Sequence, residues 1–96
     1  MLKHVVFIKF KADASESAIA DMEKGLAGLP PRIPEIKGYE FGRDVVRSPR
    51  SYDFALVSTF DDLDAMKRYS VHPDHQAVLK QVLAVGESIL AVDFDY

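Results

Sequence analysis

Two histidines, a tyrosine and a proline lie within the seven residues from Tyr69 to His75, and most of the chemistry available to this chain is in that heptapeptide. A tyrosine hydroxyl and a neutral imidazole can move protons to and from a bound molecule without a cofactor. In an unbroken α-helix, Tyr69 and His75 would lie about 240° apart around the helix axis and could not meet over one ligand. Pro73 changes this geometry, because proline lacks a backbone N–H and disfavours helical angles in the preceding residue.

The sequence therefore predicts one helix that ends near Val71 and a second that begins with Pro73 at its first position. The kink between them can turn both rings toward one space. His75 then lies in the first turn of the second helix, where the positive end of the helix dipole lowers its pKa and favours the neutral form that a general base needs. The alternative is structural: Tyr69 is a half-buried core aromatic, and His72 and His75 only cap and pack the helix junction.

The flanking segments indicate the elements that would position this heptapeptide. Residues 2–10 are rich in β-branched and aromatic side chains and predict a strand that is apolar on both faces. Asp13 and Glu16 have the spacing of a capping box, and an apolar stripe follows, so a helix is expected over residues 14–27. The elements expected after it are strands over residues 38–46 and 52–60, a short helix capped by Asp61 and Asp62 that runs through Tyr69, a helix from Pro73 to near Gly86, and a strand over residues 89–96.

The expected order of elements is βαββαβ, with a polar turn over residues 47–51 joining the second and third strands as a hairpin. This order is the split βαβ, or ferredoxin-like, arrangement of four antiparallel strands with helices on one face. We therefore expect a single α+β domain over residues 1–96. No repeat, linker or low-complexity segment interrupts it.

One face of the expected sheet has no cover from this chain. That face carries Val5, Phe7, Val57, Val92 and Phe94, and it is too apolar to be left to water. A chain of 96 residues buries a modest core, and with no cysteine it has neither a disulfide nor a thiolate metal site to add stability. The sequence predicts a homodimer in which the two sheets pack face to face.

Composition narrows the possible partners and cofactors. The net charge of −3, with scattered lysines and arginines, argues against nucleic acid and against an anionic membrane surface. No apolar run approaches the ~18 residues that span a bilayer, and we expect a soluble, cytoplasmic protein. His72 and His75 are three residues apart, but only Asp74 and Asp93 could join them, so no metal is expected. With no glycine-rich phosphate loop and no thiol, we expect no cofactor.

Five segments, in this order and spacing, resemble the stress-responsive dimeric α/β-barrel (Dabb) family: KHVVFIKFK, IPEIKGYEFG, STFDDLDAM, YSVHPDH and VDFD. The resemblance covers nearly the whole chain and implies a ferredoxin-like fold paired sheet to sheet. Many members of this family are stress-associated proteins without a defined reaction. One member, a plant enzyme, closes a ring in a linear polyketide without a cofactor through a tyrosine and a histidine.

The residues of that plant enzyme correspond only in part to this chain. Its acid/base pair falls on Tyr69 and His75, and its strand-one histidine falls on His4. Its pocket tyrosine, pocket histidine and bulky tryptophan are replaced here, by the three residues Leu26, Phe54 and Gly86 respectively. The resemblance thus implies that the acid/base pair is kept while two polar groups of the pocket are lost.

The candidate catalytic residues are Tyr69, His75 and His4. Alternation along the first strand places His4 on the face of Val6 and Ile8, toward the helices, where a lone histidine can also be a satisfied core group. The candidate ligand-binding residues, all expected around the space between helices and sheet, are Met22, Leu26, Tyr39, Phe54, Leu56, His72, Val78, Leu79 and Ile89.

Three functions remain open from the sequence. The favoured one is a stress-responsive homodimer that binds a small apolar or aromatic ligand in a pocket between helices and sheet. The second is a cofactor-free polyketide cyclase, lyase or isomerase that uses Tyr69 and His75 as its acid/base pair. The third is a purely structural stress protein, and a fully packed core would favour it.

Overall fold

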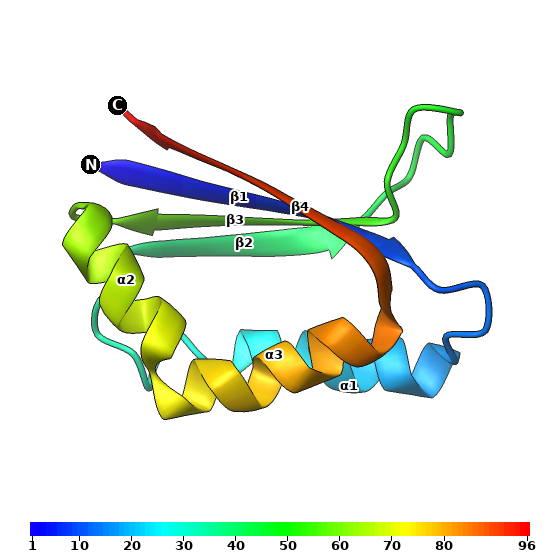
Figure 1. The fold of residues 1–96 in the computed structure, drawn as a ribbon, viewed down its shortest axis with the longest axis horizontal. Coiled ribbons are helices and arrows are strands. Elements are labelled where there is room, and N and C mark those ends of the chain that lie inside the picture. Colours follow the sequence, from blue (N-terminus) through cyan, green and yellow to red (C-terminus); the bar gives the residue numbers. More distant parts are fainter.

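The computed structural model describes all 96 residues and forms one layer of helices against one antiparallel sheet (Figure 1). The elements are β1 (Leu2–Phe10), α1 (Glu16–Ala27), β2 (Gly38–Arg43), β3 (Phe54–Phe60), α2 (Leu63–Val71), α3 (Pro73–Val85) and β4 (Gly86–Asp95). The strand order is β2-β3-β1-β4. This is the predicted ferredoxin-like βαββαβ fold, with its second helix divided into α2 and α3.

The α1 helix is capped differently from the prediction. The Oγ of Ser15 accepts a hydrogen bond from the backbone N–H of Ala18 at 3.1 Å, so Ser15 is the N-cap. The predicted capping box of Asp13 with Glu16 is therefore wrong, because a serine two residues further on has the same three-residue spacing to a free N–H. Glu16 instead forms an ion pair with Arg43 at 2.7 Å, which links the start of α1 to the end of β2.

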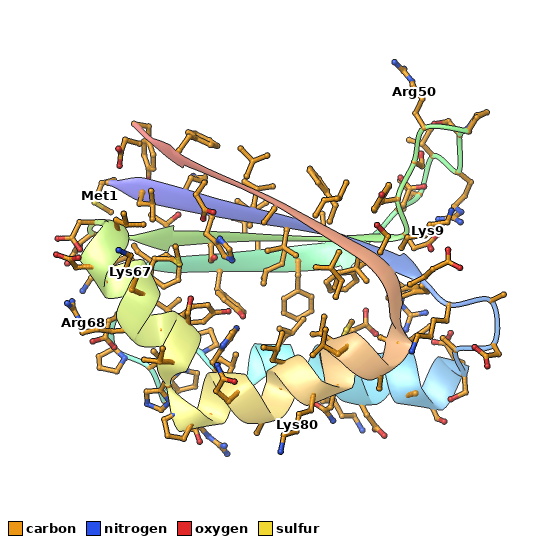
Figure 2. All side chains as sticks on the ribbon, viewed as in Figure 1. Met1, Lys9, Arg50, Lys67, Arg68 and Lys80 are labelled. Carbon is orange, nitrogen blue, oxygen red and sulfur yellow. The ribbon has the colours of Figure 1, made fainter.

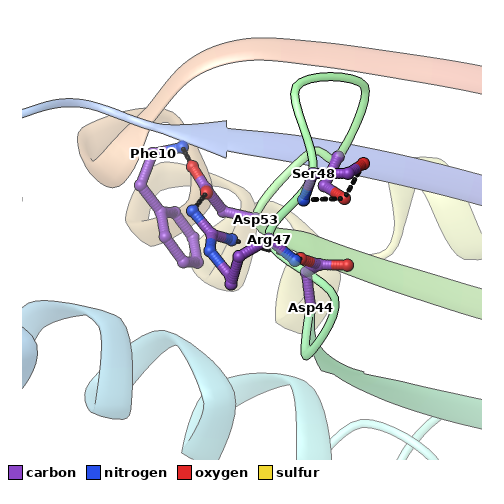
Figure 3. A network of polar contacts seen from close by, with 6 residues as sticks. Phe10, Asp44, Arg47, Ser48 and Asp53 are labelled. Atoms are coloured by element: carbon purple, nitrogen blue, oxygen red, sulfur yellow. Dashed lines mark hydrogen bonds and ion pairs between the residues drawn. The ribbon is translucent and has the colours of Figure 1, made fainter.

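The strands β2 and β3 are shorter at their shared turn than the sequence predicts, because residues 44–53 form a polar loop (Figure 3). Arg47 has a left-handed φ of 56° and donates to Asp53 at 2.7 Å. The other carboxylate oxygen of Asp53 accepts from the backbone N–H of Phe10 at 2.8 Å. These two donors, the Phe10 amide first, hold the pKa of Asp53 below its usual value. The loop is thus fixed to β1 rather than extending the hairpin.

The core lies between the sheet and the helices. Its most deeply buried apolar side chains come from α1, the segment after it, and the strands β1 and β3: Ile8, Met22, Leu29, Ile33, Phe54 and Phe60. Each large apolar side chain buried in this way contributes about 1.5–3 kcal/mol relative to exposure. Phe54 stacks on Phe41 of β2 at a centroid distance of 5.7 Å, so the sheet is closely packed at its β2 end.

The opposite face of the sheet is bare in this chain, and no helix covers it (Figure 1). On this face Phe7 pairs with Leu90 and Val5 with Val92 across β1 and β4. Leu90 is 50% exposed and Val92 57% exposed. The 44–53 loop, with Arg50 near its tip, rises on the same side of the sheet (Figure 2). None of the three helices is long and apolar enough to cross a membrane.

Candidate functional site

The α2 and α3 helices meet at His72, whose backbone is extended (φ −61°, ψ 135°) rather than helical. In a continuous helix the carbonyl of Ser70 would accept from the N–H of residue 74. Here the N–H of Asp74 donates instead to the Nδ1 of His72 at 3.1 Å, so His72 caps α3. The break that Pro73 causes therefore leaves the Ser70 carbonyl available to other donors.

Two side chains of α3 form hydrogen bonds with that carbonyl. Nδ1 of His75 lies 2.9 Å and Nε2 of Gln76 lies 2.6 Å from the Ser70 oxygen. A carbonyl oxygen only accepts hydrogen bonds, so Nδ1 of His75 carries a proton and Nε2 is the basic nitrogen of the neutral ring. Burial lowers the pKa of His75, and the bond to Ser70 opposes that shift in part. The predicted direction agrees, but its main cause is burial rather than the helix dipole.

Tyr69 lies beside both candidate catalytic histidines. Its ring centroid is 4.3 Å from that of His75 and 6.4 Å from that of His4. The side chain is almost fully buried, and burial raises the pKa of Tyr69 above its usual value. The hydroxyl is therefore protonated at neutral pH and able to donate a hydrogen bond.

His4 reaches the same region from β1. Its partner across the sheet is Asp93 of β4, and the Asp93 carboxylate accepts from Nδ1 of His4. The ring also meets Phe60 edge-on at a centroid distance of 6.5 Å. This carboxylate fixes the orientation of the imidazole and leaves Nε2 as the free nitrogen.

These residues surround a cavity of about 350 Å³ between the sheet, α1, α2 and α3. Its lining consists of His4, Val6, Ile8, Leu26, Leu56, Tyr69, Ser70, His75, Gln76, Val78, Leu79, Val82, Ile89 and Ala91. The polar members come from β1 and from the α2–α3 junction, and none of the lining residues is Lys, Arg, Asp or Glu. The lysines and arginines labelled in Figure 2 lie on the outside of the molecule.

The structure thus brings together the three candidate catalytic residues and five of the candidate ligand-binding residues, Leu26, Leu56, Val78, Leu79 and Ile89. The other four do not line the cavity. Met22 and Phe54 belong to the packed core, and His72 caps α3. Tyr39 reaches the site only through its hydroxyl, which lies 2.9 Å from that of Tyr69.

Sequence reasoning missed six lining residues: Val6, Ile8, Ser70, Gln76, Val82 and Ala91. Alternation with His4 could have found Val6 and Ile8, because all three share one face of β1. Ala91 is the cross-strand partner of Val6. Ser70 and Gln76 gave no such signal, because their place depends on the carbonyl that the helix break sets free.

A second hollow, of about 410 Å³, lies against the bare face of the sheet beside the 44–53 loop. It is lined by Phe7, Gly42, Arg43, Asp44, Val45, Tyr52, Phe54 and Ala55. It contains no histidine and none of the candidate catalytic residues. No group of three or more His, Asp and Glu residues in the chain is arranged to hold a metal ion. The acid/base groups are therefore concentrated in the cavity on the helix side.

A two-layer ferredoxin-like domain with an apolar cavity and a bare sheet face defines a class of small α+β proteins. Within it, the model of the Stress responsive A/B Barrel Domain (Dabb) matches residues 2–96, and the chain belongs to this family.

Named relatives agree with this assignment. The chain is 30% identical over 95 residues to the stress-response A/B barrel domain-containing protein HS1 of Arabidopsis thaliana, covering 97% of this chain and 87% of HS1. It is 25% identical over 95 residues to olivetolic acid cyclase of Cannabis sativa, covering 97% and 94%. A dimeric ferredoxin-like protein of unknown function from Thermobifida fusca superimposes with a TM-score of 0.90 at 30% identity, covering 99% of this chain and 90% of that one.

Proposed function

We propose that this protein is a homodimer that binds a small, uncharged apolar or aromatic molecule in the cavity between its helices and sheet. The observation that carries the proposal is the cavity itself, about 350 Å³ in volume, with apolar walls and a cluster of polar side chains around Tyr69. Small-ligand pockets have this make-up, and their volumes are roughly 300–1,000 Å³. A purely structural protein would have no need of this space.

The lining also limits the charge of the ligand. An ionic group would leave water for walls that offer no Lys, Arg, Asp or Glu to pair with it. Burying an unpaired charge is far more costly than burying a neutral polar group. A neutral molecule with a mainly hydrocarbon or aromatic body fits these walls, and its polar end would lie near Tyr69, His75 and His4.

The bare face of the sheet supports the homodimer. It exposes Phe7, Leu90, Val92 and Phe94 in one continuous apolar surface. A second copy would cover this surface with an identical one, in an interface of about 1,200–2,000 Å² or more. The relative from Thermobifida fusca is described as dimeric.

Binding can be tested with the neutral dye N-phenyl-1-naphthylamine, whose fluorescence rises in apolar surroundings. Leu79→Trp should fill the cavity and abolish the rise, because Leu79 lines it. Leu83→Trp is the matched control on the same helix, since Leu83 is 55% exposed and outside the lining. Native mass spectrometry of the purified protein should also reveal small molecules retained from the cell. Equal dye binding by Leu79→Trp, Leu83→Trp and the parent would contradict the proposal.

A second candidate is a cofactor-free cyclase, lyase or isomerase. It is favoured by one specific observation: the bond from Nδ1 of His75 to Ser70 leaves Nε2 as a base beside the Tyr69 ring. In this scheme Nε2 of His75 takes a proton from a carbon next to a carbonyl group, while the Tyr69 hydroxyl donates to the carbonyl oxygen. One relative of the chain is named as a cyclase.

Proton abstraction can be measured without knowing the substrate. Acetophenone in D2O should exchange its methyl protons faster in the presence of the protein, and NMR would follow the loss of the methyl signal. His75→Ala should remove the acceleration, and His72→Ala should retain it, because His72 does not line the cavity. If the parent protein binds acetophenone without any acceleration, the protein is a binder and not an enzyme of this kind.

A further inference from the structure

Tyr39 of β2 meets Tyr69 from outside the cavity. The two hydroxyl oxygens are 2.9 Å apart, and the rings meet at 65° with centroids 6.3 Å apart. Tyr39 also packs edge-on against Phe41, at a centroid distance of 6.4 Å, which holds its ring in place. Tyr69 lines the cavity, whereas Tyr39 does not. The pair therefore connects β2 to the ligand space through one hydrogen bond.

Two phenols share this bond, and only one of their two protons can lie in it. If Tyr69 donates to Tyr39, the proton of Tyr39 needs another acceptor, and the protein provides none for it. If Tyr39 donates to Tyr69, the remaining proton belongs to Tyr69 and can point into the cavity that Tyr69 lines. When a ligand in the cavity offers an acceptor oxygen, only the second arrangement pairs both protons, and because an unpaired buried donor is costly, this arrangement is favoured in the complex.

We infer that Tyr39 is a positioning residue, whose hydroxyl donates to the oxygen of Tyr69 and thereby turns the Tyr69 proton toward the ligand. The inference rests on the proposed ligand-binding function and specifies the ligand further: its polar end is a hydrogen-bond acceptor, such as a ketone or aldehyde oxygen. No hydrogen bond joins the Tyr69 hydroxyl to His4 or His75, so the ligand oxygen is the acceptor available to it.

Burial also fixes the protonation of the pair. Burial raises the pKa of both tyrosines, so both hydroxyls carry a proton at neutral pH and each is able to donate.

Two probes of nearly the same shape test the inference: acetophenone, which has a carbonyl oxygen, and α-methylstyrene, which has a CH2 group in its place. The unmodified homodimer should bind acetophenone on the order of tenfold more tightly, the worth of one good hydrogen bond. Tyr69→Phe should abolish this preference. Tyr39→Phe should reduce it several-fold while leaving the affinity for α-methylstyrene unchanged. Tyr52→Phe is the control, because the Tyr52 hydroxyl contacts Ser88 at 3.1 Å and lies outside the cavity.

The sign of the Tyr39→Phe effect decides between the two arrangements. If Tyr69 donated to Tyr39, removing Tyr39 would release the Tyr69 proton and increase the preference for acetophenone, which would overturn the inference. An unchanged preference, or equal losses for both probes, would do the same. If the neutral dye binds the parent protein but acetophenone has no advantage, ligand binding stands and the acceptor assignment fails. If neither the dye nor either probe binds, the ligand-binding function itself fails, and the inference with it.

Discussion

The two faces of the sheet are built by alternate residues of the same strands, yet they differ in every respect that matters for function. In β1, Ile8 is 2% exposed and its neighbour Phe7 is 39% exposed. The helix-side face is covered by the chain itself and retains a hollow with polar side chains. The other face is uncovered and apolar at its centre, with Lys3, Lys9 and Glu40 around that centre. The proposed function assigns ligand binding to one face and self-association to the other, so substitutions should affect them separately.

The largest effect is expected from a charge on the bare face. Val57→Asp would bury an unpaired carboxylate in the seam between two sheets, a cost that an interface of this size does not readily offset. Light scattering at micromolar concentration should then give a monomer or unfolded protein. Leu83→Asp, on the exposed side of α3, should remain dimeric. A monomeric parent protein, or a dimeric Val57→Asp variant, would refute the proposal that this face is the dimer interface.

The next effect concerns the cavity face alone. If the protein catalyses proton transfer, His75→Ala and Tyr69→Phe should each lower the rate by about 10²–10⁴, the usual worth of a general acid or base. Both variants should remain dimers, because neither residue lies on the bare face. His72→Ala should instead lower stability through the loss of a helix cap, by about 1 kcal/mol, with turnover retained. A His75→Ala variant with unchanged binding and activity but a lower melting temperature would make His75 a packing residue.

A smaller effect is expected at the helix break that shapes the cavity. Pro73→Ala restores a backbone N–H and permits a more continuous helix. The N–H of Asp74 could then compete with His75 for the Ser70 carbonyl. We expect ligand affinity to fall several-fold with little change in stability. Nitrogen NMR of the His75 ring should show a smaller share of the Nδ1–H form. An unchanged ring signal together with unchanged affinity would mean that the fold, not Pro73, holds His75 in place.

The features that the sequence could predict are those with local causes. Proline is tolerated in the first turn of a helix but not in its interior, so the α2–α3 junction at Pro73 was predictable. Alternation in β1 was enough to place His4 toward the helices. The order of elements and the apolar periodicity then gave the ferredoxin-like fold and its bare face.

The features that it could not predict depend on partners distant in the chain. The Tyr39–Tyr69 hydrogen bond joins residues from β2 and α2 that are 30 positions apart, and no pattern in the sequence predicts this contact. Val45 and Val46 favour an extended strand locally, but Arg47 and Asp53 hold the loop away from the hairpin. The roles of Tyr69, His75 and His4 in binding or catalysis stay predictions, because geometry alone does not test them.

The smallest expected effect is a pH dependence of the folding stability that comes from His75, the buried histidine of the cavity. Burial holds the pKa of His75 below 6.5, so as the pH falls through 6.5 the unfolded chain takes up a proton that the folded protein does not. Stability is therefore retained above pH 6.5 and is lost progressively between 6.5 and the lower folded pKa. The pKa values of Glu35 and Asp53 are also lowered, but from 4.5 and 3.8, so their losses occur at more acidic pH.

Urea unfolding at fixed protein concentration, at several pH values between about 7.5 and 5.5, should measure this slope. His75→Gln keeps an amide donor for the Ser70 carbonyl but does not titrate, so its stability should fall less over the same range than that of the parent. If His75→Gln and the parent lose stability equally, His75 is not the group that burial keeps neutral, and its proposed role as a base loses its electrostatic support.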